Sequence, residues 1–110
     1  MQNVLAHPQT VTFQPVGHIN ASNADTLEHQ LVTAISSNKY STVVADMSQV
    51  ESLDSAGLMA LVSALNLAQR SGQEFFLCCV PPSIRIIFEL TQLNQAFEVL
   101  DERPISAVAA

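Results

Sequence analysis

The chain has 110 residues, of which 48% are hydrophobic and 5% aromatic, and its formal net charge is −6. This length predicts a single domain over residues 1–110, with a core of Val, Ile, Leu and Ala and a few Phe. With only four basic residues, the chain lacks the clustered Lys and Arg of a nucleic-acid-binding surface, and binding to anionic lipid is disfavoured. Charged residues make up 13%, so much of the surface is neutral, as suits a protein-binding module.

Nothing in the sequence indicates insertion into a membrane. No segment approaches the ~18 consecutive apolar residues of a membrane span. The N-terminus, MQNVLAHPQT, has no basic cluster followed by an apolar core, so it does not resemble a signal peptide. We therefore expect a cytoplasmic protein.

The N-terminal part predicts two strands and a helix. Val4–Leu5 forms a short first strand, and the alternation over residues 10–16 predicts a second, half-buried strand. Ser22 and Asp25 resemble a capping box, and a helix over residues 23–36 follows. The apolar stripe of this helix consists of Ala24, Leu27, Leu31, Ala34 and Ile35.

The most informative stretch begins at Ser41 and reads STVVADMSQVESLDSAGLMALVSALNLAQR. A short apolar strand over residues 42–45 ends in Asp46, and a polar loop over residues 47–53 precedes a helix. Ser55 lies where that helix begins, so its hydroxyl is a natural N-cap. A helix N-terminus also favours negative charge, so a serine there can carry a phosphate at little cost. One face of the helix is formed by Leu58, Leu61, Val62, Leu65 and Ala68.

The C-terminal part predicts a strand, a helix and a last strand. Residues 74–80 are a nearly continuous apolar run, typical of a strand whose two faces are both covered by helices. The helix over residues 84–90 is apolar nearly all round, which predicts deep burial; the alternative is a helix that also contacts a partner. Residues 97–100 form the last strand, and residues 104–110 form a weak helix or a frayed tail.

This alternation of strands and helices predicts an α/β fold. The expected order is β-β-α-β-α-β-α-β, with a mostly parallel central sheet of about four to five strands packed by three to four helices. The first strand is expected to pair antiparallel at one edge.

The cysteines and histidines predict no metal site. Cys78 and Cys79 are neighbours in a predicted strand, so their side chains should point to opposite faces and form no disulfide. We interpret them as small apolar strand residues. The histidines, His7, His18 and His29, are scattered without ligand spacing.

Enzymatic chemistry has little support in the sequence. Asp25, Asp46 and Asp54 are expected near Ser55 at the carboxyl ends of the strands, where carboxylates could hold magnesium or act as acid and base. No histidine base lies near Ser55 in sequence, and the chain has no nucleophile elbow, P-loop or dinucleotide fingerprint. We predict no catalytic residue. From the pattern alone, Ser55 is equally well explained as a helix cap beside aspartates that solvate a loop.

Four segments together resemble the STAS domain, the family named for sulfate transporters and anti-sigma-factor antagonists. They are GHIN, VVADMSQVESLDSAGLMAL, AQRSGQEFFLCCVPPSIRIIFELTQL and FEVL, and they cover nearly the whole chain. The most specific parts are the aspartate-ending strand with its D-S-A-G-L sequence and the Pro-led helix that ends in E-L-T-x-L. Departures from the family pattern include His18 for a frequent acidic residue, Asn20 for a frequent aspartate and Gln92 for a frequent glycine.

Small STAS proteins are bacterial anti-sigma-factor antagonists, and the resemblance implies that role. The serine after the aspartate of D-S-x-G-L, here Ser55, is then phosphorylated by a serine kinase that is also the anti-sigma factor, and a PP2C-type phosphatase reverses the step. ATP is bound by the kinase, so no cofactor is implied for this chain. The expected partner-binding residues are Asp25, Asp46, Asp54, Ser55, Ala56, Gly57 and Met59.

Met59 is included because of its place on the helix. It lies about 100° round from Leu58, on a mostly polar side, so we expect it to be exposed one turn from Ser55. Two other functions stay open: an accessory subunit of a membrane transporter without phosphorylation, and an enzyme that uses the aspartates.

Overall fold

The computed structural model describes residues 9–102 and 107–109, so the predicted strand at Val4–Leu5 and its antiparallel pairing lie outside the described residues. The elements are β1 (Thr10–Phe13), β2 (Gly17–Ile19), α1 (Ala24–Ser36), β3 (Thr42–Asp46), β4 (Val50–Leu53), α2 (Ser55–Arg70), β5 (Glu74–Cys78), α3 (Pro82–Leu90), the 3-10 helix η2 (Leu93–Gln95), β6 (Glu98–Leu100) and β7 (Ala107–Ala109).

The strands form a five-stranded sheet in the order β6-β5-β3-β1-β7 and a two-stranded sheet of β2 and β4. Every pairing among the described strands is parallel, and Thr12, Val44 and Phe76 lie side by side in register. The predicted α/β fold with a parallel central sheet is therefore confirmed.

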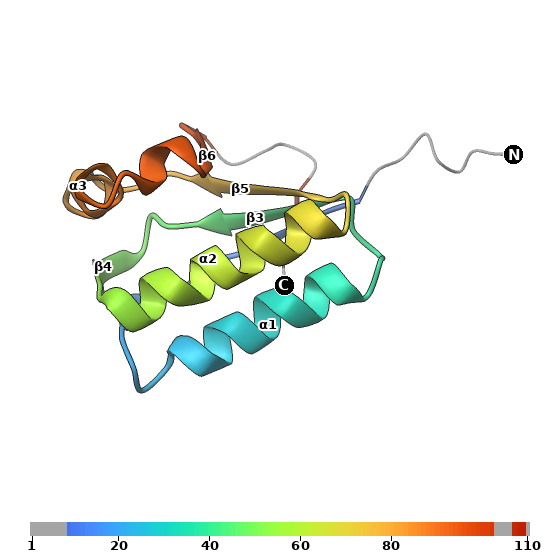
Figure 1. The fold of residues 1–110 in the computed structure, drawn as a ribbon, viewed down its shortest axis with the longest axis horizontal. Coiled ribbons are helices and arrows are strands. Elements are labelled where there is room, and N and C mark those ends of the chain that lie inside the picture. Colours follow the sequence, from blue (N-terminus) through green and yellow to red (C-terminus); the bar gives the residue numbers. More distant parts are fainter. Residues whose placement is uncertain (1–8, 103–106, 110) are drawn as a thin grey trace, which may run out of the picture.

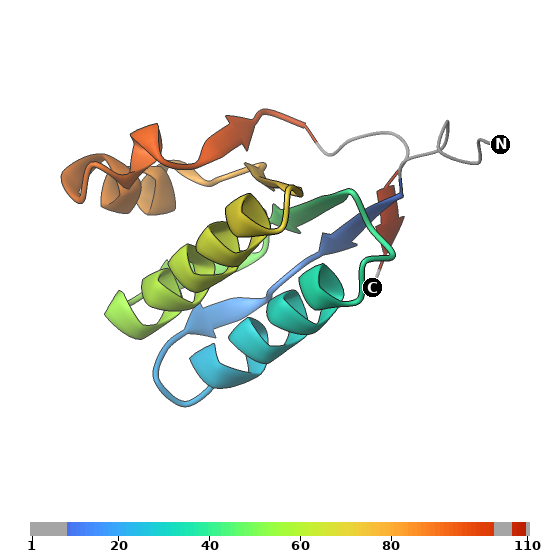
Figure 2. The same cartoon turned by 45° about the vertical axis from the view of Figure 1, so that its right-hand side comes forward.

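Helices α1 and α2 lie side by side against one face of the five-stranded sheet (Figures 1 and 2). Because β1, β3, β5 and β6 succeed one another in a single direction across the sheet, right-handed crossovers place both helices on the same face. As expected for a covered strand, β5 is largely buried, with only Glu74 exposed and Phe76 half-buried. The predicted α1 stripe is confirmed, since all five of its residues are buried.

The strand predicted over residues 10–16 is shorter than expected, and a separate strand that was not predicted follows it. The strand β1 ends at Phe13, and β2 begins at Gly17 in the other sheet. Pro15 lies between them and has no N–H to donate to a ladder, which accounts for the break. β1 is also more buried than predicted, because Thr12 is only 3% exposed.

The polar loop predicted before α2 contains a strand. β4 pairs with β2, and the N–H of Gly17 donates to the carbonyl of Gln49 at 2.8 Å. Val50 and Leu53 are buried while the two residues between them are exposed. The two-stranded sheet therefore continues the β1–β3 pair towards the start of α2.

The other corrections concern the last third of the chain. Residues 107–109, predicted as a weak helix or tail, form β7 and pair with β1. On α3, Ile84 and Phe88 are buried, but Ile86 is 51% and Leu90 80% exposed, so deep burial all round is wrong. Within residues 9–102 and 107–109, none of the helices has both the length and the apolarity needed to cross a membrane.

Candidate functional site

The start of α2 is organised by Asp54. This residue is extended, its N–H donates to the carbonyl of Ile19 at 3.1 Å, and its Oδ1 accepts a hydrogen bond from the N–H of Gly57 at 3.1 Å. Asp54 is therefore the N-cap, and Ser55 is the first helical residue. The prediction that Ser55 caps the helix is wrong by one position, because the bond to Ile19 holds the preceding residue in the extended conformation that a cap needs.

Gly57 lets α2 lie directly on the two-stranded sheet. A Cβ atom at this position would be 2.6 Å from Cγ2 of Ile19 and 2.7 Å from Cδ1 of Leu53. Both distances are shorter than any ordinary van der Waals contact between carbons. The glycine of the D-S-A-G-L sequence is thus required by packing, and Gly57 itself is buried.

Ser55 and Met59 lie on the solvent-facing side of α2. Ser55 is exposed, and Met59 is 57% exposed. Residues four apart on a helix are neighbours on its surface, so the hydroxyl and the thioether belong to one patch. The predicted exposure of Met59 is confirmed. Ala56 is half-buried.

The loop before α1 is held by asparagines rather than by the predicted capping box. Oδ1 of Asn23 accepts from the N–H of Asn20 at 2.9 Å, and Nδ2 of Asn23 donates to the carbonyl of His18 at 2.8 Å. Oδ1 of Asn20 accepts from both the N–H and the hydroxyl of Ser22. The hydroxyl of Ser22 is therefore engaged with Asn20. Asp25 is exposed in the first turn of α1, and α1 and α2 start at the same end of the molecule (Figure 1).

The three aspartates differ in burial and do not form a common metal site among the residues that the structure describes. Asp46 is only 4% exposed; its Oδ1 accepts from the N–H of Ser48 at 2.9 Å, and its Oδ2 accepts from Nε2 of Gln14 at 3.4 Å. Asp25 and Asp54 are exposed on the surface. Among the described residues, these carboxylates form no group that could hold one ion. The structure therefore gives no support to a magnesium site built from these three carboxylates.

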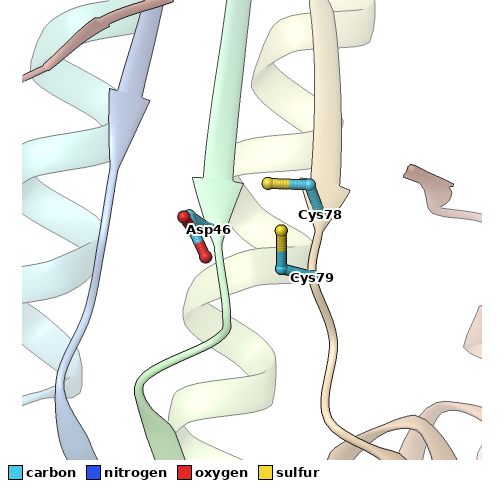
Figure 3. Close-up of side chains that lie close together, drawn as sticks. All are labelled: Asp46, Cys78 and Cys79. Atoms are coloured by element: carbon cyan, nitrogen blue, oxygen red, sulfur yellow. The ribbon is translucent and has the colours of Figure 1, made fainter. Parts of the chain in front are cut away.

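Asp46 instead lies beside both cysteines (Figure 3). Its carboxylate and the sulfurs of Cys78 and Cys79 all lie within 4.8 Å of one another. β5 ends at Cys78, and Cys79 has a φ of 58°, so the alternation of strand side chains stops there. The prediction that the two cysteines point to opposite faces is therefore wrong, although neither forms a disulfide.

One polar group near the site was not anticipated. Nδ1 of His18 is 2.6 Å from Oγ of Ser52, and its Nε2 is 3.8 Å from Oε1 of Glu51. The His18 and Glu51 side chains are 65% and 70% exposed. These contacts link β2 to β4 on the solvent side, and only the parallel pairing of the two short strands could have revealed them. Both His18 and His29 are exposed.

The chain belongs to the STAS domain family, because the family model for the STAS domain matches residues 2–106. A relative from Bordetella bronchiseptica, named as a proposed anti-sigma factor antagonist, BtrV, is 33% identical over 94 residues, which are 84% of this chain and 79% of BtrV. The aspartate, serine and glycine at the start of α2 thus stand within a match to the family that covers most of the chain.

Solved structures share the fold. A proposed anti-sigma factor antagonist from Thermotoga maritima has a TM-score of 0.79 at 24% identity, covering 84% of this chain and 80% of that one. The anti-sigma factor antagonist SpoIIAA in its unphosphorylated form has a TM-score of 0.74 at 17% identity, covering 87% and 84%. A sulfate transporter family protein from Wolinella succinogenes also has 0.74, at 18% identity, covering 84% and 77%. Homologues of this chain are thus named as anti-sigma factor antagonists, and the fold also occurs in a transporter family protein.

Proposed function

We propose that this chain is an anti-sigma factor antagonist, a non-enzymatic protein-binding module of the cytoplasm that is switched by phosphorylation of Ser55. The observation that carries the proposal is the exposed Ser55 hydroxyl at the first residue of α2, inside a STAS domain. The partner is a serine kinase that also acts as the anti-sigma factor and supplies its own ATP. A PP2C-type phosphatase resets the switch.

The switch follows from charge at a rigid surface. Phosphorylation adds nearly two negative charges next to the Asp54 carboxylate, which already caps the helix through the N–H of Gly57. The positive end of the helix dipole tolerates this charge within the domain. A partner that covers Ser55 must remove water from the phosphate, which weakens binding. A hundredfold loss of affinity corresponds to only ~2.8 kcal/mol.

The binding surface is smaller than the predicted residue set. Asp25, Asp54, Ser55 and Met59 are exposed, so they are the proposed direct contacts, with the half-buried Ala56 between them. Asp46 and Gly57 are buried. We assign these two a supporting role: Gly57 seats α2 on β2 and β4, and Asp46 fixes the turn after β3 through the N–H of Ser48.

Mass mapping after incubation with candidate serine kinases and ATP tests the assignment. We expect phosphate on Ser55, no labelling of Ser55→Ala, and unchanged labelling of Ser52→Ala, which is the matched control because Ser52 is also exposed nearby. Phosphate mapped mainly to Ser48, Ser52 or Ser63 would contradict the assignment.

Binding measurements separate charge from shape. Asp and Asn have nearly the same shape, so Ser55→Asp should weaken kinase binding strongly while Ser55→Asn and Ser55→Ala retain most of it. Equal affinities for the Asp and Asn variants would show that charge does not gate the interface.

A second candidate function is an accessory role in a membrane transporter, which the similarity to the Wolinella succinogenes protein favours. In that role Ser55 stays unmodified. Failure of every candidate kinase to label the folded chain, together with capture of a transporter, would favour it over the antagonist function.

A further inference from the structure

The carboxyl ends of β3 and β5 bring together three metal-ligating side chains that the proposed switch does not use. These are the Asp–Cys–Cys cluster: Asp46, Cys78 and Cys79, whose carboxylate oxygen and sulfurs all lie within 4.8 Å of one another. Asp46 and Cys78 are register partners on neighbouring strands. Cys79 follows the end of β5 and has a positive φ of 58°, so the alternation of side chains stops and its sulfur lies on the same side as the other two groups (Figure 3).

The cluster is mostly buried, and its carboxylate is held in place by hydrogen bonds, as in a metal-binding site. Asp46 is 4% exposed and Cys78 fully buried, whereas Cys79 is half-buried and gives access from solvent. The Asp46 carboxylate is oriented by the N–H of Ser48 and, at longer range, by the amide of Gln14. Hydrogen bonds of this kind orient metal-ligating carboxylates.

We propose that the Asp–Cys–Cys cluster binds one thiophilic divalent cation, with zinc as the physiological ion. Two thiolates and one carboxylate select zinc over magnesium or calcium, which prefer oxygen ligands alone. In a tetrahedral zinc site the donor atoms are about 3.5–3.8 Å apart, given bonds of ~2.3 Å to sulfur and ~2.0 Å to oxygen. Contraction of the cluster by about 1 Å is therefore sufficient.

The fourth position is open on the side of Cys79. A water molecule from solvent fills it, since the three protein ligands leave one tetrahedral corner. Each thiol releases its proton to solvent as it becomes a thiolate ligand. The site lies at the sheet ends rather than on the α2 surface, so this inference stands independently of phosphorylation at Ser55.

Zinc titration of the reduced, metal-stripped full chain, in competition with a chromophoric chelator, tests the proposal. We expect one zinc per chain, a rise in melting temperature, and a thiolate-to-metal charge-transfer band when cobalt(II) is the probe. Cys79→Ser should weaken the band, because one of the two thiolates is lost, and should weaken zinc binding by at least about 100-fold. Asp46→Asn, which replaces a charged ligand oxygen with a neutral one, should weaken zinc binding by at least about 10-fold, since even loss of a group that only supports a ligand costs about 10- to 100-fold.

Two controls keep the result interpretable. Asp25→Asn removes an exposed carboxylate outside the cluster and should leave zinc affinity unchanged. Cys79→Ser changes a half-buried side chain, so circular dichroism should show an intact fold, whereas Cys78→Ser at a fully buried position is a less secure variant. Absence of stoichiometric zinc binding at micromolar concentration, or equal zinc affinity of the original chain and Cys79→Ser, would overturn the proposal.

Discussion

Replacing Gly57 with alanine should destabilise the domain, although alanine is the better helix former. The added Cβ would be 2.6 Å from Cγ2 of Ile19 and 2.7 Å from Cδ1 of Leu53. Leu53 can move its terminal methyl, but Cγ2 of Ile19 is attached to a β-branched carbon with few rotamers, and the Ile19 Cβ itself would be 3.2 Å away. The helix or the β2 strand must therefore shift.

The two opposing terms decide the sign. Overpacking a close contact typically costs about 1–3 kcal/mol, while alanine in place of glycine within a helix gains at most about 1 kcal/mol. Subtracting the full gain leaves an expected net loss of up to about 2 kcal/mol, which corresponds to a fall in melting temperature of up to about 8 °C for a domain of this size. Urea unfolding followed by circular dichroism measures it.

A double-mutant cycle with Ile19→Ala checks the reasoning. Ile19→Ala removes Cγ2 and itself costs about 2–5 kcal/mol, so the cycle is best measured at low temperature. If the contact with Ile19 is the cause, Gly57→Ala should cost at least about 1 kcal/mol less in the Ile19→Ala background. The same cost in both backgrounds would refute the steric explanation.

Three further substitutions test other features of the structure. Asp54→Ala should lower the free energy of unfolding by about 1 kcal/mol, because it removes the cap on the Gly57 N–H. Ser55→Ala, at the next residue, should lower it by at most about half as much. A larger loss of stability for Ser55→Ala than for Asp54→Ala would show that Ser55 is the cap. Met59→Ala should leave thermal stability nearly unchanged and weaken kinase binding by at least ~1 kcal/mol in a titration; a destabilised fold with intact affinity would identify Met59 as a core residue. Gln92→Gly should stabilise the domain by about 0.5–1 kcal/mol in urea unfolding, because Gln92 is exposed and has a φ of 63°, which glycine adopts without strain. A loss of stability would mean that the Gln92 side chain makes a contact that stabilises the fold by more than the strain at this position costs.

The long helices could be predicted from the sequence because each carries its signal locally. The five apolar residues of α1, from Ala24 to Ile35, recur over three turns and are all buried. On α2 the same periodicity identifies the buried face, with Val62 only half-buried at its border. The end of α2 was also predictable, because Gly72 has the positive φ typical of a residue that follows a helix.

The strands β2 and β4 could not be predicted in the same way. They are three and four residues long, too short for an alternating pattern, and β4 contains Glu51 and Ser52. Each becomes a strand only by pairing with the other, which is remote in sequence. Tertiary pairing, rather than local propensity, therefore decides their structure.

The details of the site depend on single backbone positions. Asp54 and Ser55 are both good N-cap residues, and the choice between them is made by the hydrogen bond from Asp54 to the carbonyl of Ile19. Cys79 lies one residue beyond the end of β5, where strand alternation no longer applies. Because sequence patterns do not define the ends of helices and strands to the residue, neither the true cap nor the Asp–Cys–Cys cluster could be predicted.

The all-parallel pairing of the sheet has a consequence for how this chain folds. Thr42 pairs with Glu74 at a separation of 32 residues, and no hairpin joins any two of the described strands of the main sheet. Loop closure must therefore precede every strand pairing, which slows folding relative to a chain rich in local contacts. The pairing of β1 with β7 is the most remote, since Thr10 lies beside Ala107. During synthesis this edge of β1 stays open until the residues of β7 have emerged, almost 100 residues after Thr10, and an open strand edge is where unwanted association between nascent chains begins.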